Sequence, residues 1–273
     1  MLLISSLDRE HEAKDSGQGI AATRIYNSLV SDLNGKTIFI SGGARRLGRA
    51  IVLAMAQSGA NVAFTFRSSA NEATQTLKQI EAAGVRGLAI ECDLRRADDA
   101  AMAVENAVGY FGQIDVLINN AGVFQTAGFE DITAEQWDEV FAVNVRAPFL
   151  LSQRCAPALR KARGRIINLG SLGGEKPWAT HAHYCSSKAA LHMLTQVMAK
   201  ALAPDIAVNC VAPGMIAAEG TKDPALLERL ASRTPMKTNG TPQDVVSAVM
   251  YFAAAPHFIT GQVLTVDGGL GLS

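Results

Sequence analysis

Tyr184 and Lys188 stand four residues apart in "YCSSK", at the start of a long stretch with helical spacing. Residues i and i+4 of a helix lie on one face, one turn apart, so the phenol and the ammonium are expected side by side. A neighbouring ammonium favours the phenolate and lowers a phenol pKa that is normally about 10. Such a tyrosine can exchange a proton with a carbonyl oxygen. The same spacing also occurs on ordinary helix surfaces, so the pair alone decides nothing.

Two further polar residues support the catalytic interpretation. Ser171 follows the apolar run "RIINL" shortly before Tyr184, and Asn144 stands in "VNV" of the preceding helical segment. A hydroxyl, a phenol, an ammonium and an amide at one edge of a sheet form a plausible carbonyl-polarising site. The sequence therefore predicts a catalytic set of Asn144, Ser171, Tyr184 and Lys188.

The elements that must position these residues follow a repeating pattern from Lys36 onward. Short apolar runs alternate with alanine-rich stretches at helical spacing, such as residues 49–57, 72–83 and 97–111. This alternation predicts right-handed βαβ crossovers, and near-continuous apolar strands predict a sheet covered on both faces. The predicted fold is α/β, a Rossmann-type doubly wound three-layer sandwich with a seven-stranded parallel sheet. Its strands are expected at "TIFIS", "NVAFTF", "RGLAIE", "IDVLIN", "GRIINLG", "IAVNCVAP" and "QVLTVD".

In such a sheet, ligands bind beyond the carboxyl ends of the strands, where the strand order reverses. The residues directly after each apolar run are therefore the candidates for a site, before any motif is considered. These segments are residues 41–48, 67–69, 93–94, 119–122, 170–174 and 213–220.

The first of these segments, "SGGARRLG", has the placement of a dinucleotide-binding loop. Glycine lets the backbone approach a pyrophosphate, and the following helix offers unpaired amides at its N-terminus. The spacing is not G-x-G-x-x-G, because Arg46 stands where a middle glycine could be expected, with Arg45 before it. A purely structural turn is the competing interpretation.

The second strand end, "FTFRSSANE", bears on the choice of cofactor. NAD enzymes usually place an acid here for the ribose 2′-hydroxyl, but this chain has no acid until Glu72. Arg67 and Ser68 instead suit a 2′-phosphate, which needs a cation and hydroxyl donors. This pattern favours NADP(H), although Arg67 could be a solvated surface charge. At the third strand end, Asp93 could bind the adenine or cap the helix expected near Ala97.

Composition limits the other possibilities. The 273 residues are 48% hydrophobic with 25 basic and 25 acidic side chains, which suits one domain and gives no field to attract nucleic acid or a membrane. We expect a single NADP-binding oxidoreductase domain over 35–273, after a partly flexible extension over 1–34 in which 23–33 could form a helix. The four scattered cysteines predict reduced thiols and no metal site. Without a signal peptide or a run of about 20 apolar residues, the expected location is cytoplasmic.

Taken together, the ordered motifs resemble those of the short-chain dehydrogenase/reductase family. They are "SGGARRLG", "CDL", "NNAG", Asn144, Ser171, Tyr184 with Lys188, "VNCVAPG" and the closing "VDGG", and they run over about residues 35–269. The resemblance implies hydride transfer between a nicotinamide and a carbonyl-type bond. The small-molecule substrate would be, foremost, a 3-oxoacyl thioester-type ketone reduced to an alcohol.

The resemblance also implies residue roles. Tyr184 would be the acid in reduction, Lys188 would lower its pKa and hold the ribose hydroxyls, and Ser171 would bind the substrate oxygen. Asn144 would hold a water that relays protons to Lys188, while Asn119 would tie the central strands together. The implied cofactor-binding residues are Ser41, Gly42, Arg45, Arg46, Leu47, Gly48, Arg67, Ser68, Asp93, Leu94, Asn120, Ala121, Gly122, Tyr184, Lys188, Pro213, Gly214 and Ile216, the last through its backbone.

Two departures from the family pattern leave alternatives open. Many relatives have a threonine after "PG" where this chain has Ala217 and Ala218, so one cofactor hydrogen bond is missing or comes from Thr221. Arg46 in the loop resembles the pteridine reductase branch, in which it would reach the phosphates and the substrate. A pteridine or dihydrofolate reductase is therefore the alternative function, and a non-catalytic NADP(H)-sensing regulator is a third.

The substrate pocket and the assembly are the least defined parts. "GGEKPWATHAHY" is expected at the pocket mouth, with Trp178, His181 and His183 as candidates; Trp178 could stack on a planar substrate, and His183 is expected to point away from Tyr184. The resemblance also implies a homo-oligomer, a dimer or tetramer. The apolar faces of residues 144–162 and 184–203 are its expected interface.

Overall fold

The computed structural model describes residues 33–217 and 224–272. It contains one seven-stranded sheet in which the described pairs of neighbours are all parallel, in the order β3-β2-β1-β4-β5-β6-β7. Each of the seven predicted strands is present, within two residues of the expected ends. Their bounds are β1 Thr37–Ile40, β2 Asn61–Phe66, β3 Gly87–Glu91, β4 Val116–Asn119, β5 Arg165–Leu169, β6 Ala207–Pro213 and β7 Val263–Val266.

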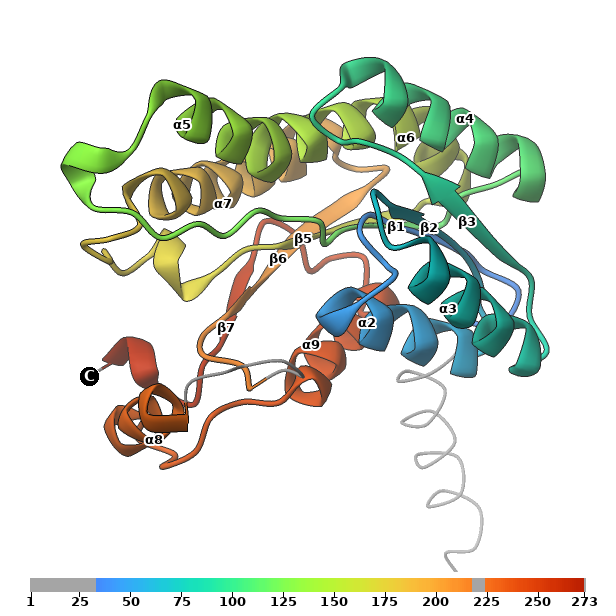
Figure 1. Cartoon of the computed structure of the whole chain (residues 1–273). Coiled ribbons are helices and arrows are strands. Elements are labelled where there is room, and N and C mark those ends of the chain that lie inside the picture. Colours follow the sequence, from blue (N-terminus) through green and yellow to red (C-terminus); the bar gives the residue numbers. More distant parts are fainter. Residues whose placement is uncertain (1–32, 218–223, 273) are drawn as a thin grey trace, which may run out of the picture.

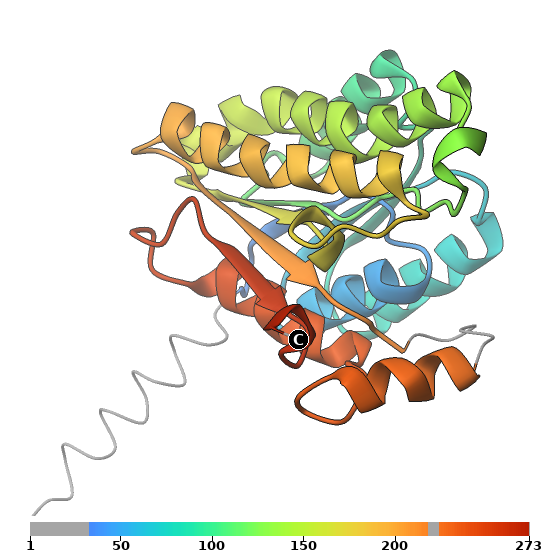
Figure 2. The same cartoon turned by 90° about the vertical axis from the view of Figure 1, so that its left-hand side faces the viewer.

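Helices cover both faces of this sheet, so the predicted three-layer α/β fold is confirmed (Figure 1). One layer contains α2 (Arg46–Gln57), α3 (Ala70–Ala82) and α9 (Pro242–Ala254). The other contains α4 (Ala97–Phe111), α5 (Ala134–Phe141), α6 (Ala147–Ala162) and α7 (Ala182–Leu202). The helix α8 (Pro224–Arg233) lies outside these layers, near the C-terminal end of the described chain (Figure 2).

Short helical segments complete the chain. A π-helical turn, η2 (Ala142–Arg146), joins α5 to α6. Three 3₁₀ turns are η1 (Phe129–Asp131), η3 (Leu172–Gly174) and η4 (Leu270–Leu272).

The helix prediction was right in type and partly wrong in extent. The stretch 97–111 coincides with α4, but α2 begins at Arg46 instead of Arg49, and α3 begins at Ala70 instead of Glu72. The prediction followed the alanine-rich stretch, which begins at Arg49 after Gly48. Gly48 lies in the first turn, where the backbone amides need no partner within the helix, so it does not interrupt α2.

Two apolar cores lie on opposite faces of the sheet, as the continuous apolar strands predicted. Alternation along β1 shows the division, because Ile38 and Ile40 belong to the core with α2, α3 and α9, and Phe39 belongs to the other. A chain of buried polar side chains runs from strands β4 and β5 to helix α7. Asn119 Nδ2 donates to Asn168 Oδ1 over 2.8 Å, and Asn168 Nδ2 donates to Thr195 Oγ1 of α7 over 2.8 Å, which confirms that Asn119 ties the central strands together.

Some expectations concern parts of the chain that are not described. The helix suggested for 23–33 and the possible cofactor contacts of Ala218 and Thr221 lie outside the described residues. All four cysteines are free, and Cys92, Cys155 and Cys210 are buried. Among the described helices, none has the length and apolar character needed to cross a membrane.

Candidate active site

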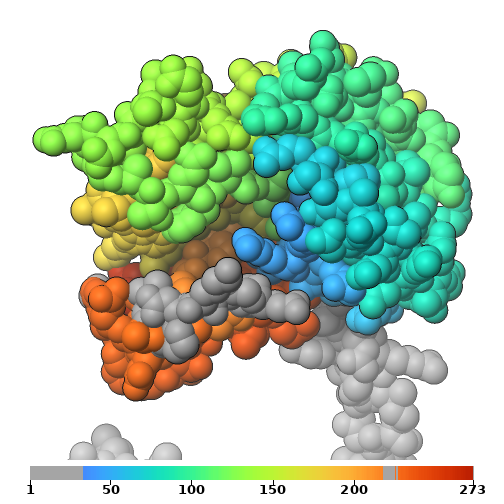
Figure 3. Space-filling view, in the orientation of Figure 1, coloured from blue at the N-terminus to red at the C-terminus, as the bar shows by residue number. Residues whose placement is uncertain are grey.

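A cavity of about 1120 Å³ opens at the carboxyl ends of the strands, where the topology placed it. It lies across the switch point at which the order passes from β1 to β4. Figure 3 shows the cleft in the space-filling surface, between the green chain segments and the blue and orange ones. Residues that follow each of β1 to β6 line it, and Leu230 and Arg233 of α8 complete the wall.

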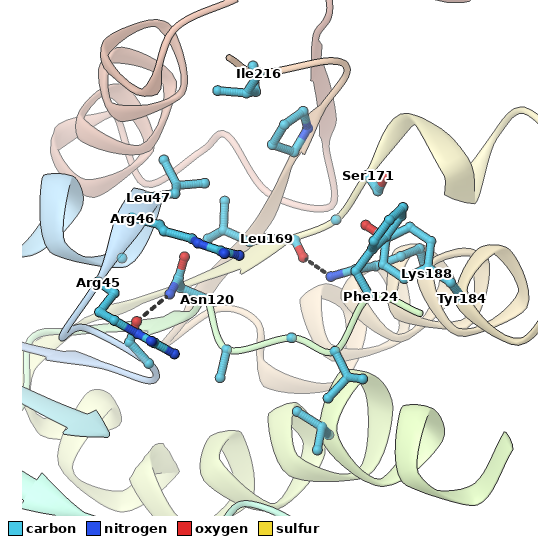
Figure 4. A pocket seen from close by; sticks show the side chains of 18 of the residues that line it. Arg45, Arg46, Leu47, Asn120, Phe124, Leu169, Ser171, Tyr184, Lys188 and Ile216 are labelled. Atoms are coloured by element: carbon cyan, nitrogen blue, oxygen red, sulfur yellow. Dashed lines mark hydrogen bonds between the residues drawn. The ribbon is translucent and has the colours of Figure 1, made fainter. Parts of the chain in front are cut away.

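One end of the cavity holds the predicted catalytic residues. Tyr184 and Lys188 enter it from the first half of α7, and Ser171 comes from the end of β5 (Figure 4). Lys188 is buried, and its Nζ donates to the carbonyl oxygen of Leu169 over 2.7 Å. Ser171 Oγ accepts from the N–H of Gly173 over 3.1 Å, so the hydroxyl hydrogen is left to donate elsewhere. The predicted convergence of these three side chains is what the structure shows.

The pKa of Tyr184 differs from the expectation. Burial raises the pKa of the phenol, and a hydrogen bond with the Ser171 side chain acts in the opposite direction. Lys188 does not lower it, because its Nζ lies 5.8 Å from the centre of the Tyr184 ring and bonds to a backbone carbonyl. Burial lowers the pKa of Lys188 to about 8. The tyrosine therefore keeps its proton at neutral pH, the form that a proton donor requires.

Asn144 lies behind this end of the cavity and does not line it. It is buried in the π-helical turn η2, and its Nδ2 donates to the carbonyl of Val123 and to Ser187 Oγ, each over 3.0 Å. Its Oδ1 accepts from the N–H of Val123 over 2.8 Å. Both amide hydrogens are thus committed, and only a lone pair of Oδ1 is left for a water. The side chain fixes the loop after β4 to α7, a structural role that the resemblance did not imply.

The opposite end of the cavity is built by the loop between β1 and α2. A Cβ on Gly48 would lie 2.0 Å from the carbonyl oxygen of Gly42, so only glycine fits. The helix α2 has no side-chain cap and no acid in its first turn, which leaves its N-terminal amides open to an anion. Arg46 has a φ of 50°, in the left-handed region, at a cost of roughly 1–2 kcal/mol. Its side chain nevertheless extends into the cavity (Figure 4).

Hydrogen bonds to neighbouring strand ends fix this loop. The N–H of Gly42 donates to Thr65 Oγ1 over 3.0 Å and the N–H of Gly43 to the Thr65 carbonyl over 2.9 Å. Ser41, predicted to touch the cofactor, is buried and does not line the cavity. Its Oγ accepts from the backbone N–H groups of Asn120 and Ala121 over 3.1 and 3.0 Å. Ser41 and Thr65 therefore act on the shape of the loops.

The acidic and basic groups at the far end of the cavity form one network. Arg95 bonds to the Asp93 carboxylate through Nε and holds its pKa down at about 2. The same guanidinium reaches Glu139 Oε1 of α5 at 3.3 Å, and Arg67 Nη1 lies 4.0 Å from that oxygen. Asp93 does not cap α4, whose first turn follows Arg96 without a side-chain cap. The capping alternative was therefore wrong, and the Arg95–Glu139 link was not predicted.

The remaining predicted cofactor residues all face the cavity. They are Gly42, Arg45, Arg46, Leu47, Gly48, Arg67, Ser68, Asp93, Leu94, Asn120, Ala121, Gly122, Pro213, Gly214 and Ile216.

Aromatic rings surround Tyr184 at the cavity mouth. The centroid of Phe124 is 4.8 Å from that of Tyr184, and Trp178 lies nearly parallel to Tyr184 at 6.1 Å. His181 also lines the mouth, where its ring nitrogens meet the hydroxyls of Thr126 and Thr180 at 3.0 and 2.9 Å. The candidate His183 is buried and does not line the cavity.

The structure adds Phe124 to the site. Phe124 was not among the predicted residues, although it stands two positions beyond "NNAG", still at the carboxyl end of β4, and this place is the signal that points to it.

Comparisons with known proteins identify the family of this chain. A family model described as Enoyl-(Acyl carrier protein) reductase matches residues 42–271. The 3-oxoacyl-(acyl-carrier-protein) reductase FabG of Staphylococcus epidermidis is 33% identical over 240 residues, 86% of this chain and 98% of the relative. The chain belongs to the short-chain dehydrogenase/reductase family.

Solved structures of this family superpose closely on the chain. A short-chain dehydrogenase/reductase from Serratia marcescens is 38% identical with a TM-score of 0.84, covering 88% of this chain and 99% of that one. A blue fluorescent protein from a metagenomic library, solved in complex with NADPH, is 34% identical with a TM-score of 0.82 over 88% and 99% of the two chains. The chain is thus an oxidoreductase, and the uncapped N-terminal amides of α2 at one end of the cavity fit the pyrophosphate of a nicotinamide dinucleotide.

Proposed function

We propose that this short-chain dehydrogenase/reductase reduces a carbonyl group to an alcohol with NADPH, with Tyr184 as general acid. The observation that carries the proposal is the Tyr184 phenol, which lines the cavity beside Ser171 and Lys188 with partial exposure and which desolvation keeps protonated by raising its pKa. A bound nicotinamide would supply the hydride. Ser171 would turn the hydroxyl hydrogen that it gives to Tyr184 toward the substrate oxygen, and Tyr184 would deliver a proton to that oxygen as negative charge develops.

Lys188 would assist the proton transfer from Tyr184 in two ways. Its Nζ is anchored to the Leu169 carbonyl and has further hydrogens to donate to the ribose hydroxyls of the cofactor. Its ammonium also stabilises the phenolate that Tyr184 becomes after giving up its proton. The positive charge therefore matters most after proton transfer.

The preference for NADPH rests on the charges at the end of the cavity opposite Tyr184, between the β1–α2 loop and Asp93, which we call the nucleotide end. Arg45, Arg46 and Arg67 line the cavity there, and Asp93 is the one acidic residue in the described lining. Arg95 bonds to the Asp93 carboxylate and also to Glu139, the acid beside Arg67, so it offsets the negative charge of both near Arg67 and Ser68. A 2′-phosphate would replace the long 4.0 Å contact between Arg67 and Glu139 with a charge-assisted hydrogen bond.

For the substrate, the first candidate is a 3-oxoacyl thioester-type ketone. The relatives named as 3-oxoacyl-(acyl-carrier-protein) reductases support it, as does Ser171, a donor suited to a ketone oxygen. The second candidate is a pterin or dihydrofolate, for which the comparisons give no support. The observations that keep it as a candidate are the ring cluster of Phe124, Trp178 and His181, which could stack on a flat heterocycle, and the approach of Arg46. A non-catalytic regulator is disfavoured by the intact trio of Ser171, Tyr184 and Lys188.

The experiment is a panel of NADPH oxidation assays with an acetoacetyl thioester, dihydrobiopterin, a quinone and a simple ketone. Turnover of the thioester with Tyr184-dependent kinetics supports the first candidate. Turnover of dihydrobiopterin alone replaces it with the second. If no carbonyl compound oxidises NADPH while NADPH binds, the proposed function is wrong.

We also propose that copies of this chain associate through α6 and α7. Exposed apolar side chains, Phe149 on α6 with Met193 and Val197 on α7, line one shallow groove, to which α5 and η2 also contribute. A second copy would remove them from water. Light scattering should give a mass above 28.8 kDa, and a monomer at all concentrations would refute the association.

A further inference from the structure

His192 lies one turn after Lys188 on α7, beneath the loop that carries Ser171. The side chain is almost fully buried. Its Nε2 accepts the backbone N–H of Ser171 over 3.4 Å. His192 therefore lies on the same helix as Tyr184 and Lys188 and contacts the backbone of Ser171.

The Ser171 loop is shaped around this imidazole. A Cβ on Gly170 would lie 2.3 Å from His192 Nε2, and a Cβ on Gly174 would lie 2.7 Å from Cε1. Because both contacts are shorter than atoms tolerate, the loop approaches the ring only with glycine on either side of Ser171. The fit is mutual, since a larger side chain at position 192 would push the loop away.

The hydrogen bonds define the tautomer. Nε2 accepts from Ser171, so the ring proton resides on Nδ1, which faces Glu175 Oε1 at 3.9 Å. Glu175 Oε1 also accepts from Thr265 Oγ1 of β7 over 3.4 Å. Burial and the charge of Lys188 lower the pKa of His192 to about 4, so the ring is neutral where the enzyme works. Lys188, Glu175 and the Cys210 thiol are the titratable groups around it.

We propose that His192 is a positioning residue, which holds the Ser171 backbone so that the Ser171 hydroxyl faces the carbonyl oxygen and the Tyr184 phenol. This inference deepens the proposed function and rests on it for its kinetic consequence. Its geometric part, the constraint of the Ser171 N–H, stands apart from any activity. Small displacements of a catalytic group lower turnover steeply, because orientation contributes much of the rate.

Two amide substitutions form the matched test. In His192→Gln the side-chain oxygen can reach the place of Nε2 and accept from Ser171, whereas in His192→Asn the shorter side chain cannot. We expect His192→Asn to lower kcat about 10-fold with little change in NADPH affinity, and His192→Gln to recover most of it. Thr195 lies on the same helix as His192 and accepts a buried hydrogen bond from Asn168 of β5; Thr195→Val removes that bond and should lower Tm without this kcat loss.

Amide hydrogen exchange supplies a readout that does not need turnover. The Ser171 N–H should exchange several-fold faster in His192→Asn than in the native chain or in His192→Gln. Equal exchange and equal kcat in the Gln and Asn variants would overturn the proposal, even if both are less stable. If the native chain reduces no carbonyl but the exchange difference is found, the proposed function fails while the positioning role stands.

Discussion

The two ends of the cavity are built on different principles. At the catalytic end, Ser171 and Lys188 are buried, and each forms a hydrogen bond with a backbone group: Ser171 Oγ accepts from the Gly173 N–H, and Lys188 Nζ donates to the Leu169 carbonyl. At the nucleotide end, Arg67 and Arg95 are about half exposed, and their partners Asp93 and Glu139 come from two different segments. Proton transfer requires shifted pKa values, which burial supplies. Phosphate binding requires available charge, which exposure supplies.

Substitutions at the two ends should therefore affect different steps, catalysis at one end and cofactor selection at the other. Changes at the catalytic end should abolish chemistry and spare cofactor binding, since the phenol contributes little to holding a dinucleotide. Changes at the nucleotide end should weaken one cofactor relative to another and spare the chemical step.

Tyr184→Phe should lower kcat by roughly 10²–10⁴-fold, the usual contribution of a general acid. NADPH affinity should stay within about twofold, because the ring and its packing against Phe124 are kept. Steady-state kinetics and a fluorescence titration measure the two quantities on one preparation. Retained activity would show that another group delivers the proton.

Arg67→Ala should weaken NADPH by roughly 10–100-fold, as expected for loss of a hydrogen bond between charged groups. NADH affinity should hardly change, because NADH lacks the 2′-phosphate. The matched control is Arg96→Ala, an exposed arginine paired with Asp99 and absent from the described lining. Equal losses for the two cofactors would place the 2′-phosphate elsewhere.

The affinity for NADPH should fall as the pH rises through about 8, where buried Lys188 loses its charge. The direction follows from the lowered pKa: the ammonium, proposed above to hold the ribose hydroxyls, is present below this value and lost above it. Over the same range the unfolded chain binds more protons at this lysine than the folded chain, so its contribution to stability rises with pH. Unfolding therefore does not account for the loss.

Lys188→Met is the control for this pH profile. The affinity of this variant for NADPH should be lower than that of the native chain and should hardly change with pH, because the titrating group is gone. A native profile that is equally flat would contradict the assignment of the pKa.

Arg46→Gly should have the smallest effect and divide it between stability and binding. Glycine accepts the φ of 50° without strain, so the free energy of unfolding should rise by up to about 1 kcal/mol. Affinities for NADPH and NADH should both fall, since the pyrophosphate is common to them. Thermal denaturation measures the change in stability, and cofactor titration measures the change in affinity. A destabilised variant would show that the guanidinium holds the fold and not the ligand.

Sequence predicted the catalytic end better than the nucleotide end. Tyr184 and Lys188 share one helix, so their spacing fixes their relation, and the apolar strands fix the edge at which Ser171 joins them. Arg95 and Glu139 are far apart in the chain, and their contact depends on how α5 packs, which no local pattern encodes. The positive φ of Arg46 and the aromatic neighbours of Tyr184 also depend on tertiary packing. The direction of the Tyr184 pKa shift was wrong for the same reason, because burial cannot be deduced from spacing.

The most direct test of the account compares the native chain with Tyr184→Phe, each loaded with NADPH and mixed with an acetoacetyl thioester in a single turnover. The account predicts loss of NADPH absorbance in the native chain and almost none in the variant, although both bind NADPH equally. Equal rates in the two, or no reaction in the native chain with any carbonyl of the panel, would contradict it.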